Sequence, residues 1–190
     1  MSQAEGCFLV ASPYLSDPHF FRTVVYIIRH DSEGAFGVVI NRPGEVPLED
    51  AVGESLSHHP RREDRIYLGG PVEGPLLALH TLVGVGDPCV PKEMAPESAT
   101  LWLTSDEDHL RLLADRTDVE ARFIASYSGW GPGQLDAELR VGGWLLAEAE
   151  SSELFSDPSP LWEILVRKQG REVLASLVPS LDKGFDPQVN

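Results

Sequence analysis

The sequence predicts an α+β fold built on a mainly antiparallel sheet, and three observations support this prediction. Apolar runs rich in Val and Ile occur in pairs in the first half of the chain, as the strands of hairpins do. Helical patterns are scattered through the second half. Strands and helices do not alternate regularly, which disfavours a doubly wound nucleotide-binding fold.

The first elements are a strand, a turn and a hairpin. Residues 7–11 (CFLVA) predict a strand that ends at a Ser-Pro pair. Residues 17–21 predict a single helical turn, because Asp is a good N-cap and Pro suits the first helical position. The runs 23–30 and 35–41 are separated only by DSEG, so we expect them to form an antiparallel hairpin.

The next stretch predicts a helix and a second pair of strands. The helix begins near Pro47, on the apolar positions Leu48, Ala51, Val52 and Leu56. A polar loop over 58–64 follows, and the runs 65–70 and 75–83 suggest two strands that pair with each other. Residues 84–98 are rich in Pro and Gly, so we expect an irregular excursion over the surface.

The second half predicts shorter elements and one longer helix. These are a strand over 99–105, a helix opened by a capping box at 105–108, a strand over 120–128, a short helix ending near Arg140, a strand over 144–149 and a helical region over 158–177. We expect a single domain over residues 1–178, and a loose tail over 179–190.

Charge and hydropathy exclude several classes of protein. The 15 Lys and Arg against 30 Asp and Glu give a net charge of -15 and a pI near 4.6, which disfavours direct binding to nucleic acid. Arg61, Arg62 and Arg65 offer a small basic cluster, and the acidic residues Glu63 and Asp64 interrupt it. No apolar run approaches the roughly 20 residues of a membrane helix, and no signal peptide is present, so we expect a cytoplasmic protein without membrane attachment.

Signatures of catalysis and metal binding are missing from the sequence. The residues around Ser128 do not fit Gly-x-Ser-x-Gly, and no HExxH occurs. The ordinary explanation of His30 and His80 is a hydrogen-bonded, partly buried imidazole. Cys7 and Cys89 lie far apart, so we expect reduced thiols. The sequence therefore assigns no catalytic residue and predicts neither a metal nor a cofactor.

One glycine-rich corner could carry function. In SGWGPGQLDAEL, residues 128–139, the free amides of Gly131 and Gly133 could cradle an anion at the start of a helix. The alternative is a tight turn from strand to helix in which Trp130 fills the core. The spacing fits neither a P-loop nor a dinucleotide fingerprint, which favours the turn.

The end of the first hairpin offers further polar groups. Asn41 can satisfy backbone groups of a loop, Arg42 can pair with a carboxylate or hold the anionic part of a ligand, and Pro43 is expected to end the strand ladder. The candidate ligand-binding residues are His30, Asn41, Arg42, Trp130, Gly131, Gly133, Gln134 and Glu138.

Taken in order, these stretches resemble the YqgE/AlgH family of small bacterial proteins. The matching segments run from about residue 6 to 170: FLVASPYLSDPHFFRTVVYIIRH, GAFGVVINRP, LGGPV, the pair Leu79-His80, GWGPGQLDAEL, Trp144 and the pair Leu154-Phe155. Where the family usually has Gly-Tyr-Ala before the corner, this chain has Ser126-Tyr127-Ser128. This departure argues against a functional need for backbone flexibility at position 126.

The resemblance implies a bifurcated, mainly antiparallel sheet that curls into a pseudo-barrel with helices around it. It also implies an uncharacterised protein of a kind often labelled a transcriptional regulator, with no enzyme activity to carry over. The family-motif residues matched in this chain are Pro13, Phe20, Arg22, His30, Gly34, Gly37, Asn41, Arg42, Gly69, Gly70, Pro71, His80, Gly129, Trp130, Gly133, Gln134, Leu135, Glu138 and Trp144.

Two functional hypotheses follow from the sequence and the resemblance. The first is a cytosolic binding or regulatory module that acts through protein partners or a small polar or anionic ligand, without direct DNA contact and without chemistry of its own. The alternative is a small-molecule binder or enzyme whose site lies where the GWGPGQL corner meets the end of the hairpin. The ligand, the partner, the regulated process and the oligomeric state are left open by the sequence.

Overall fold

The strands of this protein form two open sheets, and the chain crosses between them twice. The structure is a computed structural model that describes residues 4–52, 64–89 and 100–177, without the side chains of 172–177. The strands are β1 (Cys7–Ala11), β2 (Val24–Asp31), β3 (Gly34–Val39), β4 (Pro43–Pro47), β5 (Arg65–Leu68), β6 (Leu77–His80), β7 (Asp87–Pro88), β8 (Trp102–Thr104), β9 (Ala121–Ala125), β10 (Ser128–Trp130) and β11 (Trp144–Glu148). The helices are α1 (Leu48–Val52), α2 (Glu107–Ala114), α3 (Gln134–Arg140), α4 (Ser151–Leu154) and α5 (Pro158–Leu177).

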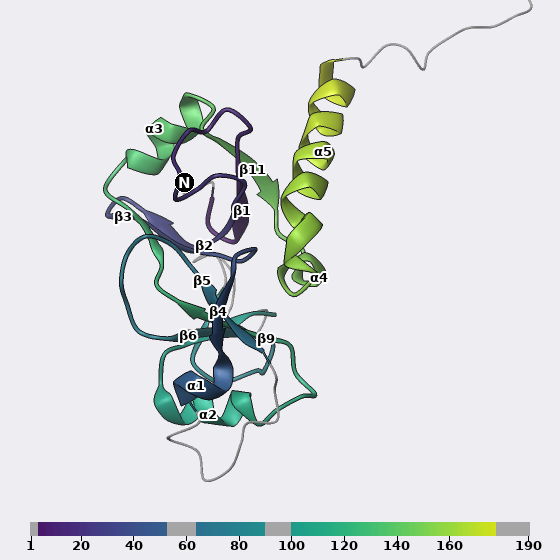
Figure 1. Cartoon of the computed structure of the whole chain (residues 1–190). Helices are drawn as coiled ribbons and strands as arrows, with labels where there is room; N and C mark the ends of the chain where they lie inside the picture. The colour runs from purple at the N-terminus through teal and green to yellow at the C-terminus, as the bar shows by residue number, and fades with distance from the viewer. Residues whose placement is uncertain (1–3, 53–63, 90–99, 178–190) are drawn as a thin grey trace, which may run out of the picture.

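The predicted fold class is confirmed. The first sheet has the order β10-β3-β2-β1-β11 and is antiparallel throughout. The second has the order β4-β5-β9-β6-β8-β7, and only β5 and β9 run parallel. Figure 1 shows the first sheet above the second, with α3 over the first, α1 and α2 beneath the second, and α5 alongside. The described strands do not close into a barrel.

Alternating side chains on the strands build three apolar cores. Phe8 and Val10 of β1 enter the core between the two sheets, whereas Leu9 faces the core under α3. In β6, Leu79 enters the same central core and Ala78 faces the core under α1 and α2. The layers are therefore, in order, α3, the first sheet, the second sheet, and the two short helices α1 and α2. Leu161 and Leu165 of α5 close the side of the central core.

Several predicted elements are confirmed, and β4 is a correction. The strand 7–11, the hairpin, the helix near Pro47, the short helix before Arg140 and the C-terminal helix all form. Pro43 was expected to end the strand ladder, but it begins β4 at the edge of the second sheet, where a missing N–H costs no ladder hydrogen bond. Leu56, most of the 58–64 loop and the tail 179–190 lie outside the described residues.

Two strand assignments were wrong, because pairing partners come from distant parts of the chain. The strands near 65–70 and 75–83 do not pair with each other, since β9 lies between them. The run 120–128 is two strands, β9 and β10, that belong to different sheets. The capping residue of α2 is Asp106 and not Ser105, because the Asp106 carboxylate accepts the N–H groups of Asp108 and His109.

Candidate functional site

The GWGPGQL corner is braced by the carboxylate of Glu138. The indole Nε1 atoms of Trp130 and Trp144 both donate to Glu138 Oε2, at 3.0 and 2.8 Å. Gln134 Nε2 donates to the other oxygen at 2.9 Å. Phe20 lies against both indole rings, 6.0 Å from Trp130 and 5.2 Å from Trp144 between centroids. These contacts hold α3 on the outer face of the first sheet.

The glycines of the corner shape the turn. Gly133 has φ 67° at the N-cap of α3, in the left-handed region that glycine adopts without steric cost. The N–H of Gly131 already donates to Gln134 Oε1 at 3.1 Å. The geometry accounts for Gly133 by turn formation and for Trp130 by packing, but it does not require glycine at position 131. An anion at this corner stays a prediction.

His30 lies beside this corner, in the interior of the protein. Its residue is 5% exposed, and its Nε2 is 3.6 Å from Asp136 Oδ1 on α3. Its backbone N–H donates to Glu5 Oε2 at 3.3 Å. Its Nδ1 is buried without a hydrogen-bond partner among the described residues. His30 therefore lies near α3, which carries Gln134 and Glu138, while ligand binding by these residues stays a prediction.

Asn41 and Arg42 serve a different segment of the chain. Asn41 accepts the N–H of Val24 at 2.8 Å and donates to the carbonyl of Arg22 at 3.0 Å. The guanidinium of Arg42 donates to three carbonyls of the preceding turn, those of Pro18, His19 and Phe21. The candidate set thus divides into a group around α3 and a pair that anchors residues 18–24.

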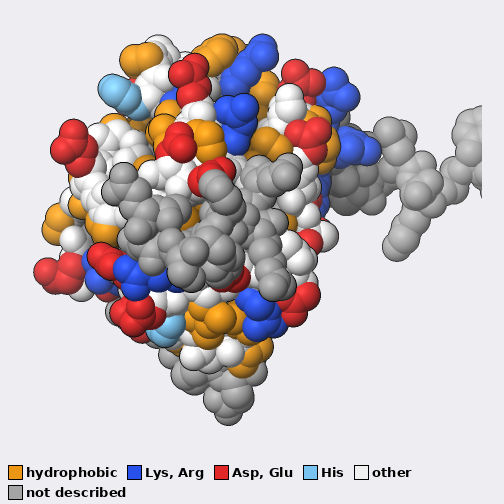
Figure 2. All heavy atoms as spheres, turned by 60° about the horizontal axis from the view of Figure 1, so that its bottom comes forward, with side chains coloured by type: hydrophobic (Ala, Val, Ile, Leu, Met, Phe, Trp, Pro, Cys, Tyr) orange, Lys and Arg blue, Asp and Glu red, His pale blue; other side chains and the backbone are white. Residues whose placement is uncertain are grey.

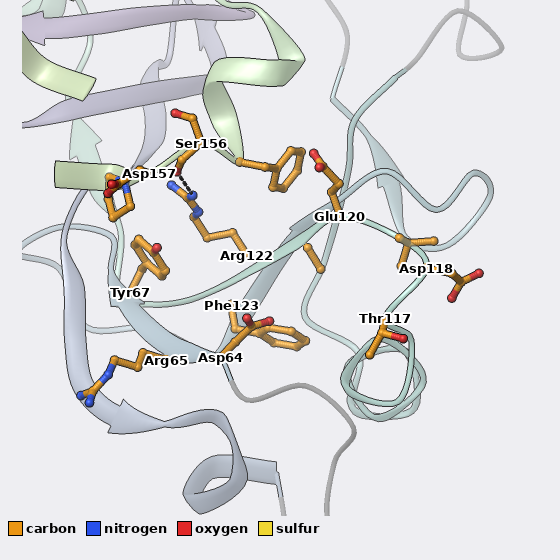
Figure 3. A pocket seen from close by; sticks show the side chains of 14 residues that line it. Asp64, Arg65, Tyr67, Thr117, Asp118, Glu120, Arg122, Phe123, Ser156 and Asp157 are labelled. Carbon is orange, nitrogen blue, oxygen red and sulfur yellow. Dashed lines mark hydrogen bonds between the residues drawn. The ribbon is translucent and has the colours of Figure 1, made fainter. Parts of the chain in front are cut away.

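Sequence reasoning missed a cavity that surrounds Arg122 (Figure 3). The cavity measures about 590 Å³ and lies between β5, β9, the loop before β9 and the turn from α4 to α5. Arg122 is 5% exposed, and its guanidinium donates to the carbonyls of Ile40 and Ser156. Its Cζ lies 4.3 Å from the centroid of the Tyr67 ring. One side chain therefore joins both sheets to the start of α5.

Burial sets the electrostatics of this cavity. Loss of solvation lowers the pKa of Arg122, while Tyr67, Asp64 and Glu120 act in the opposite direction. An arginine keeps its proton in proteins, so a positive charge stays in the cavity wall. The signal in the sequence was a lone arginine inside the apolar strand ARFIA. This pattern by itself does not identify a buried cation, because the residues that contact the arginine must also be known.

Carboxylates line the rest of the same cavity. Arg116 Nε lies 2.5 Å from Asp118 Oδ1, and the Asp157 carboxylate accepts the N–H of Ser159 at 2.9 Å. Glu120 precedes Arg122 by two residues, and in Figure 3 its carboxylate lies apart from the Arg122 guanidinium. The cavity lining therefore includes a buried cation and an exposed carboxylate.

Neither metal binding nor membrane insertion finds support in the described residues. No group of three His, Cys, Asp or Glu side chains in residues 4–52, 64–89 and 100–177 is placed to hold a metal ion. Cys7 and Cys89 are not joined in a disulfide, and burial raises the pKa of Cys89 to about 12. Within the same ranges, no helix has both the length and the apolar content needed to cross a bilayer.

Comparison with known proteins gives relatives along nearly the whole chain. The chain is 37% identical over 166 residues to a UPF0301 protein of Myxococcus xanthus, covering 85% of this chain and 88% of the relative. It is 36% identical over 201 aligned positions to a UPF0301 protein of Streptomyces coelicolor, covering 100% and 97%.

Solved structures agree with the fold. The AlgH protein from Pseudomonas aeruginosa superposes with a TM-score of 0.69 at 28% identity, covering 95% of this chain and 96% of that one. A protein of Corynebacterium diphtheriae gives a TM-score of 0.68 at 23% identity and supports the fold alone. The AlgH-like family profile matches residues 8–174. The chain therefore belongs to the AlgH-like family.

Proposed function

We propose that this protein is a binding module that takes a small zwitterionic molecule into the Arg122 cavity and acts through protein partners, without chemistry of its own. The observation that carries the proposal is the buried guanidinium of Arg122 in the wall of a 590 Å³ cavity. Cavities of about 300–1,000 Å³ suit small-molecule ligands.

The buried charge of Arg122 favours an anionic group on the ligand. Its guanidinium contacts two carbonyls and the Tyr67 ring, and it forms no ion pair with any carboxylate in the described part of the chain. Asp64 and Glu120 favour this charge without forming an ion pair with it, and the low dielectric of the interior strengthens its attraction for an anion. A ligand carboxylate that points toward Arg122 would supply a direct ion-pair partner.

Glu120 favours a cationic group on the same ligand. It is exposed and forms no ion pair among the described residues, and Phe155 also lines the cavity. An ammonium group is attracted by a carboxylate and by the face of an aromatic ring. A free amino acid carries both charges on one small molecule, so amino acids are the class that fits Arg122 and Glu120 together.

The proposal is tested by thermal shift and calorimetry with the free L-amino acids. Matched amines without a carboxylate and matched carboxylates without an amine serve as comparison ligands. We expect saturable stabilisation by one or more amino acids and much weaker effects of both comparison sets, with about 2.7 kcal/mol at a ligand concentration 100-fold above Kd. Glu120→Gln should weaken binding at least tenfold, whereas the exposed control Glu73→Gln should not.

Two results would contradict the proposal. One is the absence of any amino acid that stabilises the protein. The other is equal loss of binding in Glu120→Gln and in Glu73→Gln, because this would place the ligand away from the cavity. Glu120 is used for the variant because it is exposed, whereas Arg122 supports the fold itself.

A second candidate function is a small-molecule or substrate site at the GWGPGQL corner. The observation that favours it is the buried Nδ1 of His30, which lacks a partner among the described residues and lies beside α3. Chemical-shift perturbation of the His30 ring and the Trp130 indole by the ligand would identify this site. Perturbation confined to Tyr67 and Arg122 would favour the cavity instead.

A further inference from the structure

We propose a second, independent binding site for a small oxyanion, formed by Arg22 and Arg42 beside the start of α5. A cavity of about 350 Å³ lies there, and its lining includes Arg22, Asn41, Arg42, Trp162 and Glu163. The site does not depend on the zwitterion proposal, because Arg122 lines a different cavity that shares with this one only the lining residue Pro158.

Arg22 is held in place and its guanidinium is left unused. Its φ is 54°, a left-handed conformation that is strained for a residue with a side chain. Asn41 holds this conformation through the carbonyl of Arg22 at 3.0 Å. The guanidinium carbon lies 5.0 Å from the ring centroid of Trp162 and 5.4 Å from that of Phe21. No hydrogen bond or ion pair joins this guanidinium to another residue in the described ranges.

The strained backbone of Arg22 is a feature typical of functional sites. A strained residue persists only where its surroundings enforce the conformation, and such residues cluster at functional sites. The two ring contacts position the planar guanidinium without using its N–H donors. A guanidinium whose donors are free and whose orientation is fixed is suited to bind a phosphate or a carboxylate through two parallel hydrogen bonds.

Arg42 adds a second positive charge to the same cavity. Its N–H groups donate to the carbonyls of Pro18, His19 and Phe21, which fix its position but do not neutralise it. The carboxylate in the lining, Glu163, lies 3.6 Å from Arg167 on the next turn of α5. Two guanidinium groups against one engaged carboxylate give a locally positive cavity in a protein with a net charge of -15.

The shared chemistry of the ligand is an oxyanion, and the experiment separates its two sources. Inorganic phosphate and phenyl phosphate represent phosphate groups, and acetate and benzoate represent carboxylates. Binding is measured by calorimetry and by amide chemical shifts at constant ionic strength. We expect saturable binding of one of these two pairs, with the shifted amides at residues 22, 42 and 159.

The key variant is Arg22→Gln, and its matched control is Arg140→Gln. Both remove one positive charge from an exposed arginine, but Arg140 lies on α3, away from the cavity lining. We expect Kd to rise at least tenfold in Arg22→Gln and to change less than twofold in Arg140→Gln. Arg22→Lys, which keeps the charge and loses the planar fork, should fall between them, and circular dichroism establishes that each variant is folded.

The outcomes decide the proposal clearly. Selective loss in Arg22→Gln supports it, and the anion pair that binds identifies the source of the oxyanion. Absence of saturable binding by all four anions, or equal loss in Arg22→Gln and Arg140→Gln, overturns it. Amino-acid binding at the Arg122 cavity is expected to be unchanged in Arg22→Gln, so the two proposals can fail separately.

Discussion

At the scale of single residues, the interior histidine His80 is held in its neutral form. It is fully buried in β6, and its Nδ1 accepts the N–H of Leu82 at 3.2 Å. Burial, helped by the nearby His109, lowers its pKa from the ordinary 6.5 to about 4. The sequence interpretation of a hydrogen-bonded, buried imidazole is therefore confirmed for His80.

The depressed pKa of His80 makes folding stability depend on pH. The unfolded chain binds a proton at His80 near pH 6.5, whereas the folded protein binds it only near pH 4. Stability from this residue is therefore fully present above pH 6.5 and is lost as the pH falls toward 4, by at most about 1.4 kcal/mol per pH unit. When the free energy of unfolding in urea is measured as a function of pH, the wild type should show this additional pH dependence relative to His80→Gln. The exposed control His19→Gln should show the same pH dependence as the wild type, and an equal pH dependence in all three proteins would refute the assignment.

At the scale of elements, one short segment sends the chain from the second sheet to the first. Ser126 lies between β9 and β10 with φ 65°, and its Oγ donates to the Gly70 carbonyl at 2.8 Å. This left-handed conformation is one that glycine adopts without steric cost, and the serine hydroxyl adds a hydrogen bond that glycine lacks. The inference that function needs no backbone flexibility at position 126 stays a prediction.

The attachment of α3 to the first sheet depends on the charge of Glu138. Glu138→Gln keeps the shape but turns one oxygen into an N–H donor, which then faces either the two indole donors or the Gln134 amide. The loss of charge-assisted hydrogen bonds should lower the free energy of unfolding by about 1–3 kcal/mol. Urea titration followed by tryptophan fluorescence measures this change.

The matched control for this prediction is Glu33→Gln. Glu33 is exposed in the turn between β2 and β3, and the same change of chemistry there should alter stability by less than about 0.5 kcal/mol. If both variants were equally stable, the carboxylate would not be the group that anchors α3.

At the scale of the whole molecule, the surface charge argues against direct contact with DNA. Figure 2 shows basic side chains in separate groups on the face it presents, with acidic side chains between them. Of the three arginines in the basic cluster of the sequence, Arg65 is described, and it donates to the Glu45 carbonyl at 3.2 Å. A net charge of -15 repels phosphates at distances up to the Debye length.

We therefore expect no shift of a promoter-sized DNA fragment at physiological salt. The measurement is an electrophoretic mobility assay at about 50 and 150 mM salt, since phosphate contacts weaken steeply as salt rises. A basic DNA-binding protein on the same fragment serves as the positive control. A shift that disappears with rising salt would contradict the proposal that the protein acts without direct DNA contact.

Much of the fold could be predicted because local patterns depend on neighbouring residues. Short apolar runs, rich in β-branched residues in the hairpin, identified β1, the hairpin of β2 and β3, and β11. The position of β9 between β5 and β6 could not be predicted, because strand pairing over dozens of residues leaves no local pattern. The same lack of a long-range pattern explains why the sequence grouped Asn41 and Arg42 with the GWGPGQL corner, from which the structure separates them.

The sequence by itself determined the α+β class, most helices and strands, and the acidic character that disfavours nucleic acid, since these follow from composition and from short-range periodicity. Only the tertiary structure decided which polar groups meet. The Arg122 cavity joins Tyr67, Arg122 and Ser156, which lie on three separate segments. Residues so far apart in the chain come together only when the two sheets and α5 pack, and packing of the whole core is what sets that geometry.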